Sequence, residues 1–244
     1  MEKTTYEIEA EVEETHWWFV GRRCLLSDII NKLSLNEDIP ILDIGSSTGT
    51  NLRLLKYLGF KNYEGIDISE EAIKYCTMKN LGKVKKGNIC NLKSKDNSYK
   101  LILATDIIEH INDDLAGMME MKRVIAPDGS ILVSVPAFQF LWGIQDEVSH
   151  HKKRYTKNQL EKLINSSGLI CQEIFYFNYI LFFPILFIRI GLKLFKIKIK
   201  SENQINTKII NFILKLIFLL DIKTARYLKL PFGVSLLAII KKGS

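Results

Sequence analysis

The spacing of apolar positions predicts a helix followed by a strand near the start of the chain. Residues 17–35 place leucine and isoleucine three or four positions apart with charged side chains between them, as an amphipathic helix does. Pro40 then stands within a short apolar run at 39–44 that ends in Gly45. A short apolar run with this boundary is typical of a buried strand.

A helix and a second strand are expected directly after a loop of glycine, serine and threonine. Residues 51–58 return to helical spacing, and the next apolar run ends at Asp67. Ser69 is placed to cap a further helix, with Glu70 and Glu71 in its first turn opposite the positive end of the helix dipole. Strand, glycine loop, helix, strand and carboxylate follow one another within about thirty residues, the order of the mononucleotide-binding βαβ unit.

Strands and helices continue to alternate along the rest of the chain. Further strands are expected at 84–86, 100–105, 130–135, 170–177 and 234–240. Further helices are expected at 113–124 and 156–167. This alternation predicts an α/β fold with a doubly wound, mostly parallel sheet.

The net charge of the chain lies almost entirely at one end. Of 244 residues, 47% are hydrophobic and 25% charged, which is typical of a globular protein with a sizeable core. Residues 189–244 carry twelve basic and two acidic side chains, a net charge of +10, whereas the total is +7 and the first 188 residues therefore carry −3. The basic residues alternate with isoleucine, leucine and phenylalanine, which favours a membrane surface over nucleic acid as a partner.

Cysteine spacing and the N-terminal residues bear on the compartment. The four cysteines are widely spaced without a CxxC pair, so neither a zinc site nor a disulfide framework is expected. The acidic start, MEKTTYEIEAEVEE, has no apolar run of the kind found in secretory signals. The longest uncharged stretch, 174–188, has 15 residues, fewer than the roughly 20 that span a bilayer. We expect a cytoplasmic protein, with peripheral attachment to the inner face of the cell membrane as a further hypothesis.

The glycine loop has the features of a nucleotide site. Gly45 and Gly49 permit a sharp turn and a close approach of backbone to a ligand, while Asp43 can orient the loop or meet a cationic group. Asp67 is placed to accept hydrogen bonds from two ribose hydroxyls. The P-loop and the dinucleotide fingerprint are both excluded, since no lysine follows Gly49 and the glycines stand four apart. Glycine turns without any ligand remain the alternative.

Four motifs in succession resemble those of the class I S-adenosylmethionine-dependent methyltransferases. Within that family they are most similar to the branch that acts on small molecules, the methyltransferases of types 11 and 12. ILDIGSSTGTN is similar to the first motif of that family, YEGIDIS to its acidic second-strand end, GNIC to its adenine loop, and YKLILATDIIEHI to its fourth-strand motif. The resemblance covers about 37–167 and implies S-adenosylmethionine as cofactor and S-adenosylhomocysteine as product. The residues to which it assigns a cofactor-binding role are Asp43, Gly45, Ser46, Ser47, Gly49, Asn51, Asp67, Ile68, Asn88, Ile89, Thr105 and Asp106.

Two positions depart from the motifs of the family that the chain resembles. Ser47 stands where the family has its middle glycine, which is compatible with a cofactor if the side chain points away from it. Asn88 stands where the family usually has aspartate, so an amide oxygen would take the place of a carboxylate at the adenine amino group.

The same resemblance implies one methyltransferase domain over 1–244. Its Rossmann-like, doubly wound sheet would have seven strands in the order 3-2-1-4-5-7-6, with strand seven antiparallel. Residues 170–177 and 234–240 would be strands six and seven, which the family joins by a short turn, so 178–233 is a basic, apolar helical insertion. A helical cap, an oligomer interface and a helix lying at a membrane surface are the alternatives for this insertion.

The loop after the fifth strand holds the candidate catalytic residues. Methyl transfer from a sulfonium is an in-line displacement, so a base is needed only where the acceptor must lose a proton. Residues 142–155 follow the fifth strand and so lie at the carboxyl edge of the sheet, where ligands bind in such folds. His150 or His151 is the candidate base, Glu147 the residue that orients it, and Arg154 the group that holds an anionic substrate. A solvated polar loop is the alternative.

Three further expectations concern the surroundings of the site. His110 is a candidate to border the cofactor or the acceptor, or else a structural histidine at a helix start. Residues 1–38 are expected to form an N-terminal helical lid, although the aromatic run at 16–19 is more typical of packing. No metal is expected, because His150 and His151 are neighbours that rarely converge on one ion, and because no cysteine or third histidine is expected to lie near them.

The leading functional hypothesis is S-adenosylmethionine-dependent methyl transfer to a small or lipid-linked acceptor, most favourably to oxygen and at a membrane surface. A non-catalytic membrane or protein-interaction module that kept the methyltransferase fold is the alternative. Methylation of nucleic acid is disfavoured, because the chain has no motif of the Asn-Pro-Pro-Tyr type and its basic residues stand among apolar ones.

Overall fold

The computed structural model describes residues 3–195 and 207–243, so the part of the expected insertion at 196–206 lies outside the described residues. The strands are β1 Ile41–Ile44, β2 Tyr63–Asp67, β3 Lys83–Lys86, β4 Tyr99–Thr105, β5 Ile125–Pro136, β6 Leu169–Phe177 and β7 Ser235–Lys242. The α-helices are α1 Lys3–Val12, α2 Trp17–Lys32, α3 Thr50–Tyr57, α4 Glu70–Met78, α5 Asp114–Val124, α6 Ile144–Val148, α7 Lys157–Ser166, α8 Phe182–Leu194 and α9 Lys208–Leu228. Two single 3₁₀ turns are η1 Ile108–His110 and η2 Gln139–Leu141.

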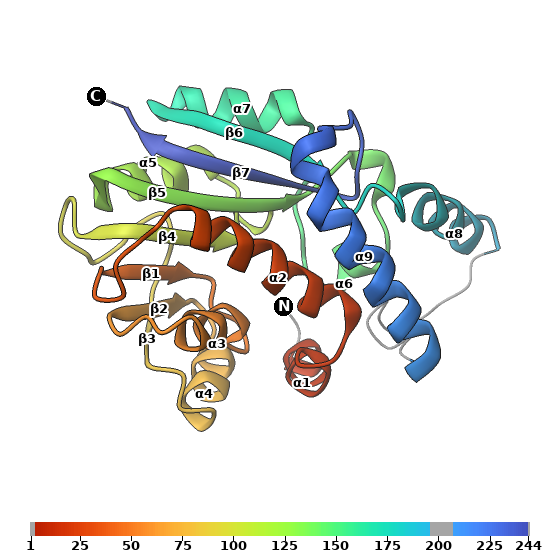
Figure 1. Cartoon of the computed structure of the whole chain (residues 1–244), viewed down its shortest axis with the longest axis horizontal. Helices are drawn as coiled ribbons and strands as arrows, with labels where there is room; N and C mark the ends of the chain where they lie inside the picture. Colours follow the sequence, from red (N-terminus) through yellow and green to blue (C-terminus); the bar gives the residue numbers. More distant parts are fainter. Residues whose placement is uncertain (1–2, 196–206, 244) are drawn as a thin grey trace.

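The seven strands form one mixed sheet (Figure 1). Their order is β3-β2-β1-β4-β5-β7-β6, and β7 runs antiparallel to both of its neighbours while the other pairs are parallel. This confirms the sheet order and the antiparallel seventh strand expected from the sequence. The carboxyl ends of β1, β2 and β4 consequently meet at one edge of the sheet, where ligands bind in folds of this kind.

Two helical layers bury the two faces of the sheet. One cluster joins apolar residues of α5 and α7 to alternate residues of the central strands, among them Met121, Leu160 and Val133. The other joins α2 and α9 to the opposite face, with Leu26 and Phe218 among its fully buried members. Because the central parallel strands are covered on both sides, they read as nearly continuous apolar runs in the sequence.

The start of β5 differs from its expected position. The strand begins at Ile125, which pairs with Tyr99, and its regular pairing resumes where Ser130 faces Leu101. The Ala-Pro-Asp-Gly stretch between these points interrupts the register without ending the strand. The turn-forming residues therefore mark an irregularity within the strand rather than its first residue.

The described part of the insertion contributes a layer of the core. Helix α9 packs along α2 and also contacts β6, and Figure 1 shows α9 lying across the sheet while α8 extends away from it. Asp221 of α9 is fully buried and accepts backbone hydrogen bonds from Asn178 at 2.7 Å and Ile180 at 2.8 Å. This carboxylate fixes α9 to the chain segment that links β6 to α8.

The outward faces of α8 and α9 remain apolar. Large side chains that are half or more exposed on these helices are Phe183, Phe187, Ile188, Leu194, Ile209, Phe212, Leu216, Leu220, Tyr227 and Leu228. Among the described residues, however, no helix combines the length and the apolar character that crossing a membrane requires.

Candidate active site

The loop after β1 turns sharply because several of its residues adopt left-handed backbone conformations. Gly45 has φ +75° and Gly49, which precedes α3, has φ +96°. Both angles favour glycine, as expected for a turn that brings backbone close to a ligand. Ser47 lies between them with φ +46°, the position at which the resembled family has a glycine.

Asp67 holds this loop against the end of β2. Its carboxylate accepts hydrogen bonds from the backbone N–H of Ser47 at 2.9 Å and of Ser69 at 2.8 Å. Burial raises the pKa of Asp67, although these backbone hydrogen bonds oppose the shift. Each carboxylate oxygen keeps lone-pair capacity for a ligand hydroxyl. Asp67 and its neighbour Ile68 both line the cavity described below.

A second polar group lies at the ends of β1 and β4. The amide of Asn51 donates to Asp43 at 2.8 Å and to the hydroxyl of Thr105 at 2.9 Å. Burial raises the pKa of Asp43 to about 6. Among the described residues, neither Oδ2 of Asp43 nor Oδ1 of Asn51 has a hydrogen-bond partner. These two buried acceptors suit a ligand that carries a positive charge or a hydrogen-bond donor.

Helix α1 covers the glycine loop. Glu9 accepts a hydrogen bond from the Ser47 hydroxyl at 2.9 Å, and burial raises the pKa of Glu9 to about 7. The buried Glu13 contacts Thr48 and pairs with Lys79 at 2.7 Å. The Ser47 side chain is thus directed to α1, which accounts for the departure from glycine at this position. Sequence reasoning missed both glutamates, although their spacing of four residues places them on one helix face.

One cavity of about 530 Å³ joins this loop to the segment that follows β5. Its wall includes twelve residues with a predicted role, namely Gly45, Ser46, Ser47, Asn51, Asp67, Ile68, Thr105, Asp106, His110, His150, His151 and Arg154. Aromatic residues of α2, among them Trp17, Trp18 and Phe19, line it from the opposite layer. Trp17 and Trp18 also pack against Phe218 of α9, so these two side chains belong to both the core and the cavity wall.

Four of the residues with a predicted cofactor-binding role lie outside the cavity wall. Asp43 and Gly49 sit behind it and support the loop, through Asn51 and through the start of α3. Asn88 is exposed and its amide oxygen accepts the N–H of Cys90 at 2.9 Å, while Ile89 is buried in the core. The structure therefore does not bring the expected adenine residues to the same cavity as the others.

Asp106 connects the cavity to α2. Its carboxylate pairs with Arg22 and accepts a hydrogen bond from Ser134 at 3.1 Å. The backbone of Asp106 has φ +53°, an uncommon angle for a residue other than glycine. The ion pair sets Arg22 of α2 against the end of β4, and both residues line the cavity.

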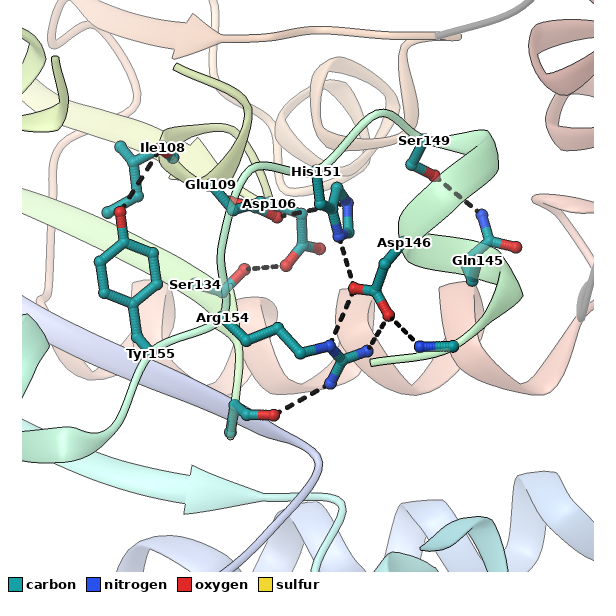
Figure 2. Close-up of polar contacts among 12 residues, drawn as sticks. Asp106, Ile108, Glu109, Ser134, Gln145, Asp146, Ser149, His151, Arg154 and Tyr155 are labelled. Atoms are coloured by element: carbon teal, nitrogen blue, oxygen red, sulfur yellow. Dashed lines mark hydrogen bonds and ion pairs between the residues drawn. The ribbon is translucent and has the colours of Figure 1, made fainter. Parts of the chain in front are cut away.

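The loop after β5 is organised by Asp146 rather than by the expected Glu147. Figure 2 shows Asp146 between two partners: its Oδ1 lies 2.8 Å from Nδ1 of His151, and both carboxylate oxygens bond the Arg154 guanidinium, at 2.8 and 2.9 Å. Burial alone would raise the pKa of Asp146, but these contacts outweigh it and hold the pKa below its ordinary value. Glu147, one position further round α6, is exposed and does not line the cavity.

Arg154 has a different position from the one expected of a substrate-binding group. Its guanidinium is buried, bidentate to Asp146, and donates to the carbonyl of Ala137 at 2.9 Å. These contacts occupy its side chain in holding the loop together. The sequence pattern identified a segment that lines the cavity but not the direction in which its charged groups point.

Glu109 and His110 of η1 lie beside His151. Burial raises the pKa of Glu109 well above its usual range, and burial lowers the pKa of His110 to about 4. The rings of His110 and His151 meet edge to face with centroids 4.6 Å apart. The expectation that no third histidine lies near His151 is therefore wrong, because η1 brings His110 to it from 41 positions earlier in the chain. His150 is exposed and has φ +57°.

Comparison with known proteins identifies the class to which this fold and this cavity belong. The family model described as a methyltransferase domain matches residues 19–174. The chain belongs to this methyltransferase family, and its cofactor is S-adenosylmethionine.

Three individual proteins show how far the similarity extends. Norajmaline N-methyltransferase of Rauvolfia serpentina is 30% identical over 140 residues, which are 54% of this chain and 46% of that protein. The chain spans about half the length of two curated relatives and 67% of a third. One matching solved structure is a complex of the Haloferax volcanii Trm112 methyltransferase activator with a methyltransferase candidate. A chain of this complex matches with TM-score 0.63 and 16% identity, and the match covers 99% of this chain and 95% of that one. An S-adenosylmethionine-dependent methyltransferase of Archaeoglobus fulgidus matches with TM-score 0.57 and 19% identity, covering 90% and 94%. Because both sequence identities are this low, these two solved structures show a similarity of fold alone.

Proposed function

We propose that the protein transfers the methyl group of S-adenosylmethionine to an oxygen of a small or lipid-linked acceptor, at the surface of an anionic membrane. One observation carries the chemical half of this proposal: a single cavity continues from Asp67 and the glycine loop to the Glu109, His110 and His151 cluster. The first part suits the nucleoside and the second suits an acceptor that must give up a proton.

The residues of the chain would have the following roles in binding and transfer. Asp67 would accept the ribose hydroxyls. The unpartnered oxygen of Asn51 at the cavity wall, with the buried carboxylate of Asp43 behind it, would favour the cationic amino acid end of the cofactor. When bound, S-adenosylmethionine supplies a methyl group on a positively charged sulfur. The acceptor proton would leave to His150 or His151, while the aromatic wall of α2 excludes water from the reaction.

Binding of the product analogue tests the cofactor half of the proposal. Isothermal titration of the untagged chain with S-adenosylhomocysteine is expected to give a one-to-one isotherm. A titration without heat at several temperatures would instead favour the non-catalytic interaction module. The atom methylated is read from mass spectra of lipid and polar extracts incubated with isotopically labelled S-adenosylmethionine, where a label on nitrogen would contradict O-methylation.

The exposed faces of α8 and α9 support the membrane half of the proposal. Phe187, Ile209 and Phe212 are 67%, 75% and 55% exposed. The acidic side chain within the described residues of these two helices is Asp221, which is buried. Lysines stand beside these apolar groups, as at Lys193. Apolar side chains surrounded by cations match an anionic headgroup layer, because lysine stems can reach the phosphates.

Flotation with vesicles of phosphatidylcholine and phosphatidylglycerol measures this association. At low salt the chain is expected to float with the vesicles, and the double variant Ile209→Glu, Phe212→Glu is expected to lower the partition coefficient at least about tenfold, since each buried apolar side chain contributes roughly 1.5–3 kcal/mol. Met78→Glu on α4, where the side chain is 81% exposed, is the matched control and should float like the unaltered chain.

Two outcomes would contradict the membrane half of the proposal. A chain that stays unbound to anionic vesicles at low salt and elutes as a dimer would assign α8 and α9 to a second copy. A chain that stays unbound and monomeric, but binds a partner protein through these helices, would assign them to a complex of the general kind for which the Haloferax volcanii structure provides an example.

A further inference from the structure

Three side chains that commonly bind metals converge at the acceptor end of the cavity. Glu109 and His110 come from η1 and His151 from the loop after α6, and one ligating atom from each lies within 4.8 Å of the others. All three residues line the cavity. Atoms bound to one ion at 2.0–2.2 Å lie at most about 4.4 Å apart, so modest side-chain movements would bring the three around one ion.

The buried carboxyl of Glu109 has no hydrogen-bond partner among the described residues. The residue is fully buried, and the lack of a partner in the described part of the chain applies to both of its side-chain oxygens. The charged atom nearest to it in the described ion pairs is Nε2 of His151, at 3.9 Å. A buried carboxylate is costly unless it is paired or coordinates a cation. A cation bound at Glu109 would supply the partner that its two oxygens lack.

The surroundings of His151 fix the direction of its ring. Nδ1 lies 2.8 Å from Asp146, whose carboxylate is itself held by Arg154 and by the backbone N–H of Gly143 at 2.7 Å. Nε2 consequently faces Glu109, as Figure 2 shows. In metal sites, a ligating histidine usually donates its other ring nitrogen to a carboxylate in this way, which fixes the tautomer and increases the basicity of the ligand.

Two contacts also fix the ring of His110. The ring forms a hydrogen bond with the backbone of Ser149, and it packs edge to face on the ring of His151. His110 has a second nitrogen for an ion, since imidazole presents two. Asp146, Arg154 and Ser149 thus orient the two histidines.

We propose that Glu109, His110 and His151 bind one divalent transition-metal ion, which leaves an open coordination position toward the acceptor. Two imidazole nitrogens and one carboxylate suit ions such as Zn²⁺, Mn²⁺ and Fe²⁺. The consequence for catalysis rests on the proposed function. An acceptor hydroxyl at the open position would ionise more readily. It would lose its proton to His150, and its oxygen would take the methyl group as the carbon–sulfur bond breaks, leaving S-adenosylhomocysteine.

Cobalt binding tests the site without depending on methyl transfer. The untagged chain, stripped with a chelator, is titrated with Co²⁺ and followed by visible d–d absorption, which reports coordination by nitrogen and oxygen. One equivalent of Co²⁺ per chain is expected to bind. Glu109→Gln and His151→Ala should weaken the affinity at least about hundredfold, and Asp146→Asn about 10- to 100-fold through loss of the contact that orients His151.

The neighbouring histidine provides the matched control. His150→Ala removes an imidazole from the same loop but outside the cluster, so the Co²⁺ affinity and spectrum should not change. Thermal unfolding without metal shows whether each variant is folded, and Glu109→Gln preserves the shape of the side chain. Absence of Co²⁺ absorption in the unaltered chain, or equal affinity in the folded Glu109→Gln variant, would overturn the metal site.

Titration with S-adenosylhomocysteine in the presence of chelator separates the two proposals. Binding of the nucleoside without binding of Co²⁺ would refute the metal site and leave methyl transfer standing. Binding of Co²⁺ without binding of the nucleoside would support the metal site and count against the proposed methyl transfer.

Discussion

Replacing Asp67 with alanine is expected to weaken the binding of S-adenosylhomocysteine by about 10²- to 10⁴-fold. The carboxylate would lose two charge-assisted hydrogen bonds to ribose, each contributing about 1.5–3 kcal/mol. The variant would also lose the contact that holds the N–H of Ser47 at 2.9 Å, so the glycine loop would be less well ordered before the ligand arrives. Isothermal titration or displacement of a fluorescent analogue measures the change.

Glu70→Ala is the matched control for this experiment. Glu70 lies three positions further along the chain, and its partner is Lys86 at 2.7 Å, in an ion pair whose side chains are both more than half exposed. Removing it changes the local charge equally but should leave the nucleoside affinity unchanged. Equal affinities of the Asp67→Ala variant and the unaltered chain would show that the ribose lies elsewhere.

The Phe218→Ala variant should lose about 3–5 kcal/mol of folding stability, as buried aromatic truncations do. Phe218 is fully buried, stacks on Trp18 with centroids 5.3 Å apart, and meets Trp17 edge to face at the same distance. Its ring occupies the space beside Gly21, where a Cβ atom would overlap it. Urea unfolding followed by tryptophan fluorescence measures the loss, because the two indoles lie at this contact.

Phe212→Ala on the same helix separates this packing role from the outward face. Phe212 is 55% exposed, so its truncation should change the free energy of unfolding by no more than about 0.5 kcal/mol. A similar loss of stability in both variants would contradict the assignment of Phe218 to the contact between α9 and α2.

The sheet and its order could be predicted from the sequence for specific reasons. β1 and β4 are buried on both faces and appear as apolar runs, and the glycine loop and Asp67 mark the ends of two neighbouring strands. The motif resemblance then supplied the order of strands that local spacing alone does not determine. The start of β5 was missed because its turn-forming residues interrupt the strand without ending it.

The candidate site was harder to predict, because contacts between distant residues organise it. Helix periodicity does not reveal that Glu9 reaches Ser47, 38 positions away. The adjacent pair His150 and His151 drew attention as a unit, yet their side chains have different surroundings, and the neighbour of His151 is His110. Likewise, whether Asp146 or Glu147 meets a histidine depends on the rotation of a five-residue helix.

The contacts of α1 have a consequence for turnover. Glu9 and Glu13 tie this helix to Ser47, Thr48 and Lys79, so the first helix and the glycine loop form one connected unit above the cavity. A nucleoside that enters or leaves beneath the helix has to break at least the contact between Glu9 and Ser47. The time for which spent cofactor remains bound would then depend on the first dozen residues of the chain, far in sequence from the groups that perform the chemistry.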